Sequence, residues 1–295
     1  MPDLRTTLDL ESFRRVVFVS GAGVSAASGI PTFRGPEGYW TVGARNYHPQ
    51  EMATRERFEQ MPKQVWRWYL YRRGVCRAAQ PNAAHRALAR LEAEIGDDFG
   101  LLSQNVDGLH LRAGNSAART HEVHGNIDYM RCAGRCDDTL VAVEAHFDDW
   151  PKARELDDDD FARLRCTACE GPMRPHVLWF DEYYEEGLFR FQSGLQRVER
   201  ADLLVFVGCS GAANLPRMAA SVALERGCFV LDINPEPNPF SELALAMAAR
   251  ARDTSTPAGT TSAASERAEG GAWLRGPADT LVPALVDGLL EARQV

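Results

Sequence analysis

Four of the seven cysteines stand in two close pairs, Cys132 with Cys136 and Cys166 with Cys169. Four thiolates on two short turns can complete the tetrahedral shell of a zinc ion and leave no coordination position open for a substrate. Four unrelated thiols are one alternative, which the two short spacings disfavour. Disulfides are another, but the N-terminal residues show no apolar signal-peptide core that would favour them. The spacing therefore predicts one structural zinc ion.

A glycine-rich segment, Gly21–Gly35, follows the apolar run Arg14–Ser20. A strand that ends in Gly-x-Gly lets backbone N–H groups approach a pyrophosphate at the start of a helix. Turns use glycine for many reasons, so Gly-x-Gly alone is weak evidence. The longer string is more specific, and it predicts a phosphate-binding loop.

Two polar segments hold groups suited to binding and proton transfer. Gln104, Asn105 and Asp107 offer neutral amides and a carboxylate, which can hydrogen-bond a ribose and a carboxamide. His124 offers an imidazole, the side chain whose unperturbed pKa lies nearest neutrality, and it suits a general base. Taken alone, a polar turn and a structural histidine are the more common explanations, and we expect His121 to be structural.

Short apolar runs that end in polar or glycine-rich loops predict the buried parallel strands that would position these groups. They cover residues 14–20, 100–103, 201–207 and 228–234. Helical spacing is present in residues 58–79, 82–92 and 281–290. This alternation predicts an α/β fold, a Rossmann-like doubly wound parallel sheet with ligands at the carboxyl ends of its strands.

The middle of the chain departs from this alternation. Residues 130–175 hold the cysteine pairs and the acidic run Asp157–Asp160, which predicts a smaller zinc-ribbon and helical subdomain inserted into the sheet domain. Residues 249–271 are rich in Ala, Ser, Thr, Gly and Arg. Such a composition buries little apolar surface, so we expect a flexible insertion there.

The composition of the 295 residues limits the partners. Hydrophobic residues make up 45% and charged residues 25%, as in ordinary globular proteins. The net charge of -8 argues against direct nucleic-acid binding, which relies on clustered Lys and Arg, and it suits a basic peptide. No run approaches the roughly 20 apolar residues that span a bilayer, so we expect no membrane contact and a cytoplasmic location.

In combination, these motifs resemble the sirtuin family of NAD-dependent protein-lysine deacylases. The segment Gly21–Gly35 is similar to the family's signature loop almost residue for residue. Residues 103–110 resemble its Gln-Asn-x-Asp-x-Leu-His element, and residues 121–126 resemble the segment that carries its catalytic histidine. The resemblance runs from about residue 12 to residue 290 and omits the low-complexity stretch.

The resemblance implies one sirtuin catalytic domain over residues 1–295 that is built of two parts. The larger, NAD-binding part takes residues 1–35, 82–128 and 183–295, and the smaller part takes the helical residues 36–81 and the zinc module 129–182. His124 would act as the base, with Asn105 and Asp107 as further catalytic residues. NAD would lie along Gly21, Ala22, Gly23, Ser25, Ile30, Phe33, Arg34, Gln104, Asn105, Asp107, His124, Gly208, Cys209, Ser210 and Asn234.

The segment Arg174–Glu182 resembles the sirtuin stretch that pairs with the substrate backbone and walls the acyl-lysine tunnel. This implies substrate contacts at Val177, Trp179 and Phe180. Asp181 stands where most family members have Gly, so the local backbone and the acyl or peptide preference can differ here. Cys209 similarly replaces a usual Thr, and that change should be tolerable.

Tyr69 and Arg72 are three residues apart and share one face of the expected helix. They match the Tyr-x-x-Arg of desuccinylase-like sirtuins, in which an Arg fork receives the carboxylate of the acyl group. The alternative for this pair is an amphipathic helix with a core Tyr and a surface Arg.

The implied activity is NAD-dependent removal of acyl groups, acetyl and also succinyl or malonyl, from protein lysines. Nicotinamide and O-acyl-ADP-ribose would be the products, and His124 would deprotonate a ribose hydroxyl after nicotinamide leaves. One rival is an NAD glycohydrolase or ADP-ribosyltransferase that uses the same site without an acyl-lysine acceptor. Another is a non-catalytic NAD or ADP-ribose sensor, which would need no base.

Overall fold

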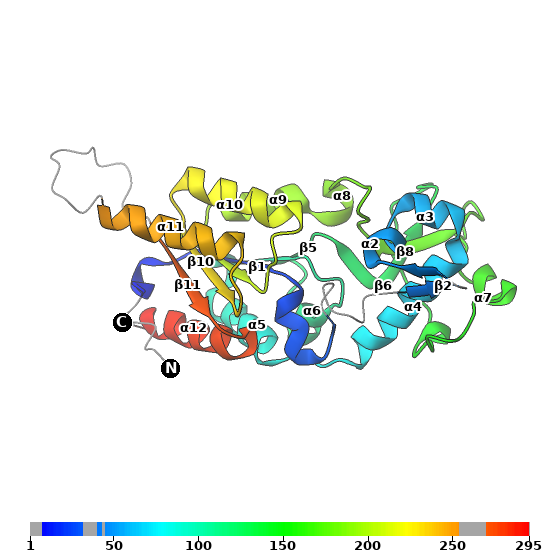
Figure 1. Ribbon diagram of the computed structural model, residues 1–295, viewed down its shortest axis with the longest axis horizontal. Coiled ribbons are helices and arrows are strands. Elements are labelled where there is room, and N and C mark those ends of the chain that lie inside the picture. The colour runs from blue at the N-terminus through cyan, green and yellow to red at the C-terminus, as the bar shows by residue number, and fades with distance from the viewer. Residues whose placement is uncertain (1–7, 32–39, 43–44, 254–269, 295) are drawn as a thin grey trace.

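A six-stranded parallel sheet forms the larger part of the molecule (Figure 1). In this computed structural model, the described residues are 8–31, 40–42, 45–253 and 270–294. The strands follow the order β11-β10-β9-β1-β4-β5. Their bounds are Val16–Ser20 (β1), Phe99–Ser103 (β4), Thr120–Glu122 (β5), Leu203–Val207 (β9), Phe229–Asn234 (β10) and Gly271–Arg275 (β11). All neighbours pair in parallel, so their carboxyl ends share one edge of the sheet.

Helices cover both faces of this sheet, which confirms the predicted doubly wound α/β fold (Figure 1). One face carries α5 (Ala83–Ile95) and α12 (Ala278–Ala292), and the other carries α9 (Phe191–Glu199), α10 (Asn214–Arg226) and α11 (Pro239–Asp253). Side chains of a strand alternate between the two layers, as Val205 and Phe206 of β9 do. Because both layers are apolar, the central strands are apolar throughout, which is why their sequences read as unbroken hydrophobic runs.

Shorter helices close the loops beside the sheet. They are η1 (Leu10–Ser12), η2 (Ala22–Ser28), η4 (Gly96–Asp98), α6 (Leu109–Ala113) and α8 (Glu186–Phe189). The helix that follows the glycine-rich turn, η2, is a 3₁₀ helix and not an α-helix. Within the described part of the chain, no helix is both long and apolar enough to cross a membrane.

The smaller part has a hydrophobic core of its own, built from residues 47–76 and 127–179. Its antiparallel sheet has the order β7-β6-β8, with β6 at Gly125–Cys132, β7 at Val141–Ala142 and β8 at Met173–Val177. Around it lie α2 (Pro49–Met52), α3 (Arg55–Gln60), α4 (Pro62–Ala78), η5 (Ala145–Phe147) and α7 (Asp158–Ala162). The predicted second subdomain beside the parallel sheet is thus confirmed.

Two segments differ from the sequence predictions. The expected helical stretch 36–81 also contains an antiparallel hairpin of β2 (Trp40–Val42) and β3 (Arg45–Tyr47). Of the expected flexible insertion 249–271, residues 249–253 belong to α11 and Gly271 begins β11, while 254–269 lie outside the described residues. The small residues at the two ends of this stretch are ordered because they let α11 pack against the backbone of β11. A Cβ on Gly271 would lie 2.5 Å from the carbonyl oxygen of Ala244.

A buried guanidinium joins α4 to the zinc-bearing segment. The Arg73 side chain is 4% exposed and pairs with Asp128 at 2.9 Å and with Asp148 at 2.6 Å. Both carboxylates are also contacted by the more exposed Arg77. Removal of one partner of such a buried pair leaves the remaining charges uncompensated, which is more costly than the net gain from forming the pair.

Replacement of Arg73 by Met should therefore lower the free energy of unfolding by about 2–3 kcal/mol, less than for a fully buried pair because both carboxylates reach solvent. Urea unfolding followed by circular dichroism measures this. Arg55→Met is the matched control, since Arg55 pairs with Glu59 at the surface and its replacement should change the free energy of unfolding by less than about 0.5 kcal/mol. Equal effects of the two substitutions would contradict the role of Arg73.

Candidate active site

The loops at the carboxyl ends of β1 and β9 meet through glycine backbones. Gly21 N–H donates to the carbonyl of Val207, and Gly23 N–H donates to that of Gly208. A Cβ on Gly21 would lie 2.6 Å from the Gly208 oxygen, and one on Gly23 would lie 2.6 Å from the Gly208 Cα. Gly208 itself has a φ of +60°. The glycines are thus required by the approach of two strand ends, whether or not a phosphate binds there.

A hydrogen-bonded cluster connects this loop to the segment after β4. The Ser25 hydroxyl donates to the Asp107 carboxylate at 2.7 Å, and the Asn105 amide donates to the Ser25 hydroxyl at 3.1 Å and to the Gly21 carbonyl at 3.1 Å. Leu109 N–H donates to the other Asp107 oxygen at 2.9 Å. The tertiary structure therefore brings together polar residues that the sequence places about eighty positions apart.

Asp107 is 6% exposed, and burial raises its pKa while the bonds from Leu109 and Ser25 act in the opposite direction. Within the part of the chain that the structure describes, no basic side chain forms an ion pair with its carboxylate. A buried carboxylate that is held only by neutral donors is available to a polar ligand.

Gln104 links the cluster to β9. Its side-chain amide donates to the carbonyl of Ser20 and to the Cys209 sulfur, both at 3.3 Å. The Cys209 thiol donates in turn to the Val19 carbonyl at 3.2 Å. Cys209 therefore makes the donor and acceptor contacts that a hydroxyl would make. Asn234, at the end of β10, donates to the Cys209 carbonyl at 2.9 Å and so joins the same edge.

His124 lies where β5 leads into β6, and both its ring nitrogens are engaged. Nδ1 lies 2.9 Å from the Gln104 carbonyl oxygen, and Nε2 lies 3.1 Å from the Tyr184 hydroxyl. Because a carbonyl only accepts, Nδ1 carries the proton and Nε2 has a free lone pair in the neutral ring. Burial lowers the pKa of His124 to about 4, against the opposing effect of the Gln104 bond. The imidazole is thus neutral near pH 7, as a general base must be.

Gly125 fixes the backbone beside this histidine. Its φ is +83°, and a Cβ there would lie 2.1 Å from the carbonyl oxygen of His176. The His124 carbonyl accepts from Leu178 N–H at 2.9 Å. These contacts tie the residue that precedes β6 to the end of β8, so His124 and the segment after β8 are fixed by one backbone contact.

The predicted substrate residues at the end of β8 and after it differ in how much of each side chain is exposed. Val177 is 7% exposed and Trp179 is 2% exposed, whereas Phe180 is 63% exposed. The Asp181 carboxylate accepts from the backbone N–H groups of Arg55 at 2.8 Å and Glu56 at 3.2 Å, and so caps the start of α3. Capping gives the Asp at this position a structural function that a glycine could not perform.

Tyr69 lies 3% exposed beneath this segment and accepts a hydrogen bond from Trp179 Nε1 at 2.9 Å. Burial raises the pKa of Tyr69, so the hydroxyl keeps its proton, while the positive charges of Arg174 and Arg72 favour the opposite shift. The Arg72 guanidinium carbon lies 5.3 Å from the ring centre of Trp68. The structure thus places the predicted Tyr and Arg within electrostatic reach of one another.

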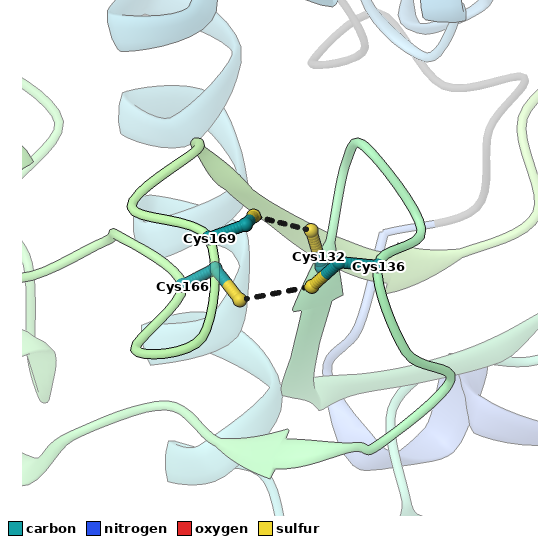
Figure 2. Close-up of side chains that lie close together, drawn as sticks. All are labelled: Cys132, Cys136, Cys166 and Cys169. Carbon is teal, nitrogen blue, oxygen red and sulfur yellow. Dashed lines mark hydrogen bonds between the residues drawn. The ribbon is translucent and has the colours of Figure 1, made fainter.

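The four predicted zinc ligands converge from two loops of the smaller part (Figure 2). Their sulfurs all lie within 4.8 Å of one another, with Cys132 and Cys169 at 3.6 Å and Cys136 and Cys166 at 3.4 Å. Zinc–sulfur bonds of about 2.3 Å in a tetrahedron give sulfur separations of about 3.8 Å. The donor set and its spacing therefore fit one structural zinc ion without a substrate position.

The remaining predicted residues differ in their exposure, and two of them lie outside the described residues. Ala22 and Ile30 are half-buried on the loop after β1, and Ser210 is exposed after β9. Phe33 and Arg34 lie outside the described residues. His121, expected to be structural, is 1% exposed, with Nδ1 3.2 Å from the Arg190 carbonyl.

The sequence profile of the Sir2 family matches residues 21–214, a stretch that includes the glycine turn, the amide cluster, His124 and the cysteines. The chain belongs to the Sir2 family. The predicted sirtuin resemblance is therefore confirmed at the level of the family.

Curated relatives of this sirtuin carry the name NAD-dependent protein deacylase. The one from Leptospira interrogans is 38% identical over 231 residues, which cover 78% of this chain and 85% of the relative. The one from Aeropyrum pernix is 40% identical over 235 residues, which cover 80% of this chain and 86% of the relative.

Solved structures agree with the fold of this sirtuin. A Sir2 homolog in complex with NAD has a TM-score of 0.74 at 29% identity and covers 99% of this chain and 95% of its own. Mutant Sir2 homologues in complex with 2'-O-acetyl ADP ribose give a TM-score of 0.75 at 30% identity, with 100% and 99% covered.

The sequence analysis did not predict two side-chain contacts at this site. Tyr184 reaches His124 from 60 residues away, and Asp181 reaches the start of α3 from about 126 residues away. The departure of Asp181 from the usual family residue was the only sequence signal for either. Nothing in the sequence around Tyr184 indicated a contact with the base.

Replacement of Gly125 by Ala should lower the free energy of unfolding of this sirtuin by about 2–4 kcal/mol, because the new Cβ meets a backbone oxygen at a positive φ. Urea unfolding measures it. Gly187→Ala is the matched control, since Gly187 lies in α8 and a Cβ added there would have no neighbouring atom within 4 Å. A Gly125→Ala protein as stable as the control would show that the backbone contact between Gly125 and His176 tolerates a side chain.

Substitution of Cys166 by Ser should reduce bound zinc from about one ion per chain to a small fraction, since three sulfurs hold the ion far less well than four. Metal analysis by mass spectrometry after gel filtration measures the content. Cys228→Ala should keep its zinc, because Cys228 lies buried beside the parallel sheet. Zinc retained in full by the Cys166 variant would contradict the assigned ligand set.

Proposed function

We propose that this sirtuin removes acyl groups from lysine side chains of proteins or peptides with NAD as co-substrate, and that its acyl pocket favours succinyl or malonyl over acetyl. The observation that carries the activity is the neutral His124 beside the Ser25, Asn105 and Asp107 cluster, at the edge where strand ends of a doubly wound sheet bind ligands. The products would be free lysine, nicotinamide and O-acyl-ADP-ribose.

The broad part of this proposal has independent support. Family membership and the names of the relatives confirm the predicted enzyme class and the predicted use of NAD. They do not favour the rival glycohydrolase or ADP-ribosyltransferase. The acyl preference, the two-part domain division and the cytoplasmic location stay predictions.

We assign the roles of the NAD-binding residues from their contacts. The loop Gly21–Ser25 would lie against the pyrophosphate, since Gly21 and Gly23 bring its backbone close to the strand ends. Asn105 and Asp107 would hold the nicotinamide end, because both lie where the loop meets the end of β4. His124 would accept a proton at Nε2, the nitrogen without a hydrogen.

The acyl preference is inferred from Tyr69 and Arg72, which lie three residues apart on α4. Tyr69 accepts from Trp179, so its own O–H stays available to donate to an acyl carboxylate. Burial raises the pKa of the Cys76 thiol, the negative charge of Asp107 raises it further and the positive charge of Arg72 lowers it, so both charges lie within electrostatic range of this thiol on α4. A guanidinium there can pair with the terminal carboxylate of succinyl or malonyl.

The test is steady-state deacylation of one lysine peptide that carries acetyl, malonyl or succinyl, with and without NAD. Arg72→Met should lower kcat/KM for the succinyl peptide by about 10- to 100-fold and for the acetyl peptide by less than about threefold. The reason is that a charge-assisted hydrogen bond contributes about 1.5–3 kcal/mol.

Arg67→Met on the same helix is the control, because Arg67 contacts Glu155 and the Lys152 carbonyl. It should change kcat/KM for both peptides alike. Equal losses for both peptides in the Arg72 variant would reject the acid pocket and keep the deacylase. Nicotinamide release without any deacylation in the wild type would instead favour a glycohydrolase.

A further inference from the structure

The hydroxyl of Tyr184 occupies the one free lone pair of the base. It lies 3.1 Å from His124 Nε2, and the two rings are 5.9 Å apart at an angle of 22°. Because Nδ1 donates to Gln104, the phenol must be the donor to Nε2 when the imidazole is neutral. In this arrangement, a substrate hydroxyl cannot reach Nε2 while Tyr184 holds its place.

A ring stack keeps Tyr184 in that position. Its ring lies on Phe191, the first residue of α9, with centroids 4.1 Å apart and planes at 11°. Burial raises the pKa of Tyr184, so the hydroxyl keeps the proton that it donates, while the backbone N–H of Leu215 in the first turn of α10 acts in the opposite direction. Displacement of Tyr184 would break the hydrogen bond to His124 and the stack at once.

We propose that Tyr184 is a catalytic residue that relays the proton from the reacting ribose hydroxyl to His124. This inference rests on the proposed function, which supplies the ribose hydroxyl. The relay follows from two observations: the phenol occupies the Nε2 lone pair that a substrate hydroxyl would need, and the stack on Phe191 holds the phenol there.

The step balances in protons and electrons. The ribose O–H bond breaks as its oxygen, which keeps the electron pair, forms a bond to the acyl carbon. The π bond between that carbon and the lysine nitrogen breaks, and its electron pair moves onto the nitrogen. Its proton passes to the Tyr184 oxygen, and the original Tyr184 proton passes to His124 Nε2. Tyr184 ends as a neutral phenol and His124 as an imidazolium, whose positive charge the Gln104 carbonyl stabilises through Nδ1–H. A phenol can take part because its oxygen both donates and accepts.

The relay would act only after nicotinamide has left. Rates measured before and after that point can therefore distinguish a proton relay from a structural role. Exchange of labelled nicotinamide into NAD, measured with the acylated peptide present, reports the steps before the base acts. Formation of deacylated peptide reports the whole reaction. A residue that only supports the fold should affect both rates together, whereas a proton relay should affect only the second.

Tyr184→Phe removes the hydroxyl and keeps the ring that stacks on Phe191. It should lower kcat for deacylation by about 100-fold, at the lower end of general acid–base contributions, and leave nicotinamide exchange within about twofold of the wild type. His124→Ala should show the same split with a larger loss. Tyr183→Phe is the matched control, since Tyr183 is 89% exposed, and it should alter neither rate.

Three results would overturn the relay. Unchanged deacylation in Tyr184→Phe would show that the hydroxyl is not used. Faster deacylation would show that Tyr184 covers the base and must leave it. Parallel losses of exchange and deacylation would show that its role is structural. A wild-type enzyme without NAD-dependent deacylation would instead refute the proposed function, which this comparison of variants does not address.

Discussion

The backbone contact between Gly125 and His176 is the constraint on which the site depends. At this point the chain leaves the edge of the parallel sheet and enters the smaller sheet, and the two backbones approach more closely than any Cβ allows. His124 precedes this contact and Leu178 follows it, and Leu178 N–H donates to the His124 carbonyl. The contact therefore fixes both His124 and the segment after β8. A rigid connection of this kind holds catalytic geometry better than side-chain packing between two mobile parts would.

Buried charges connect the elements around this contact. Arg174 is 2% exposed and lies over the ring of Trp179, with its guanidinium carbon 3.3 Å from the ring centre. Its guanidinium also pairs with Glu182, which in turn accepts from Trp179 N–H at 3.1 Å. Such a network fixes one arrangement of its members because each polar group needs its partner, even where the net gain in stability is small. Trp179 in turn donates to the Tyr69 hydroxyl, so one aromatic ring connects these charges to α4.

The environment of His124 accounts for its protonation state. Burial removes the water that would stabilise an imidazolium, and only a backbone carbonyl opposes this effect. The result is an imidazole that is already deprotonated before any substrate binds, at the point where β5 leads into β6. The cysteine loops lie in the smaller part, where four sulfurs suffice to close the coordination shell of a zinc ion, so a bound zinc would support the fold and leave no position for a substrate.

The sequence alone determined the local elements and the identity of the reactive groups. Unbroken apolar runs predicted the central strands, because both faces of a doubly wound sheet are covered, and two short cysteine spacings predicted the zinc ligands that converge in space. Only the tertiary structure decided the contacts between segments distant in the chain. Tyr184 on His124, Asp181 on α3, and the glycine contact between β1 and β9 depend on how separate elements pack. Such contacts leave no periodicity or spacing in the sequence, since the residues that meet are set by the fold and not by their distance along the chain.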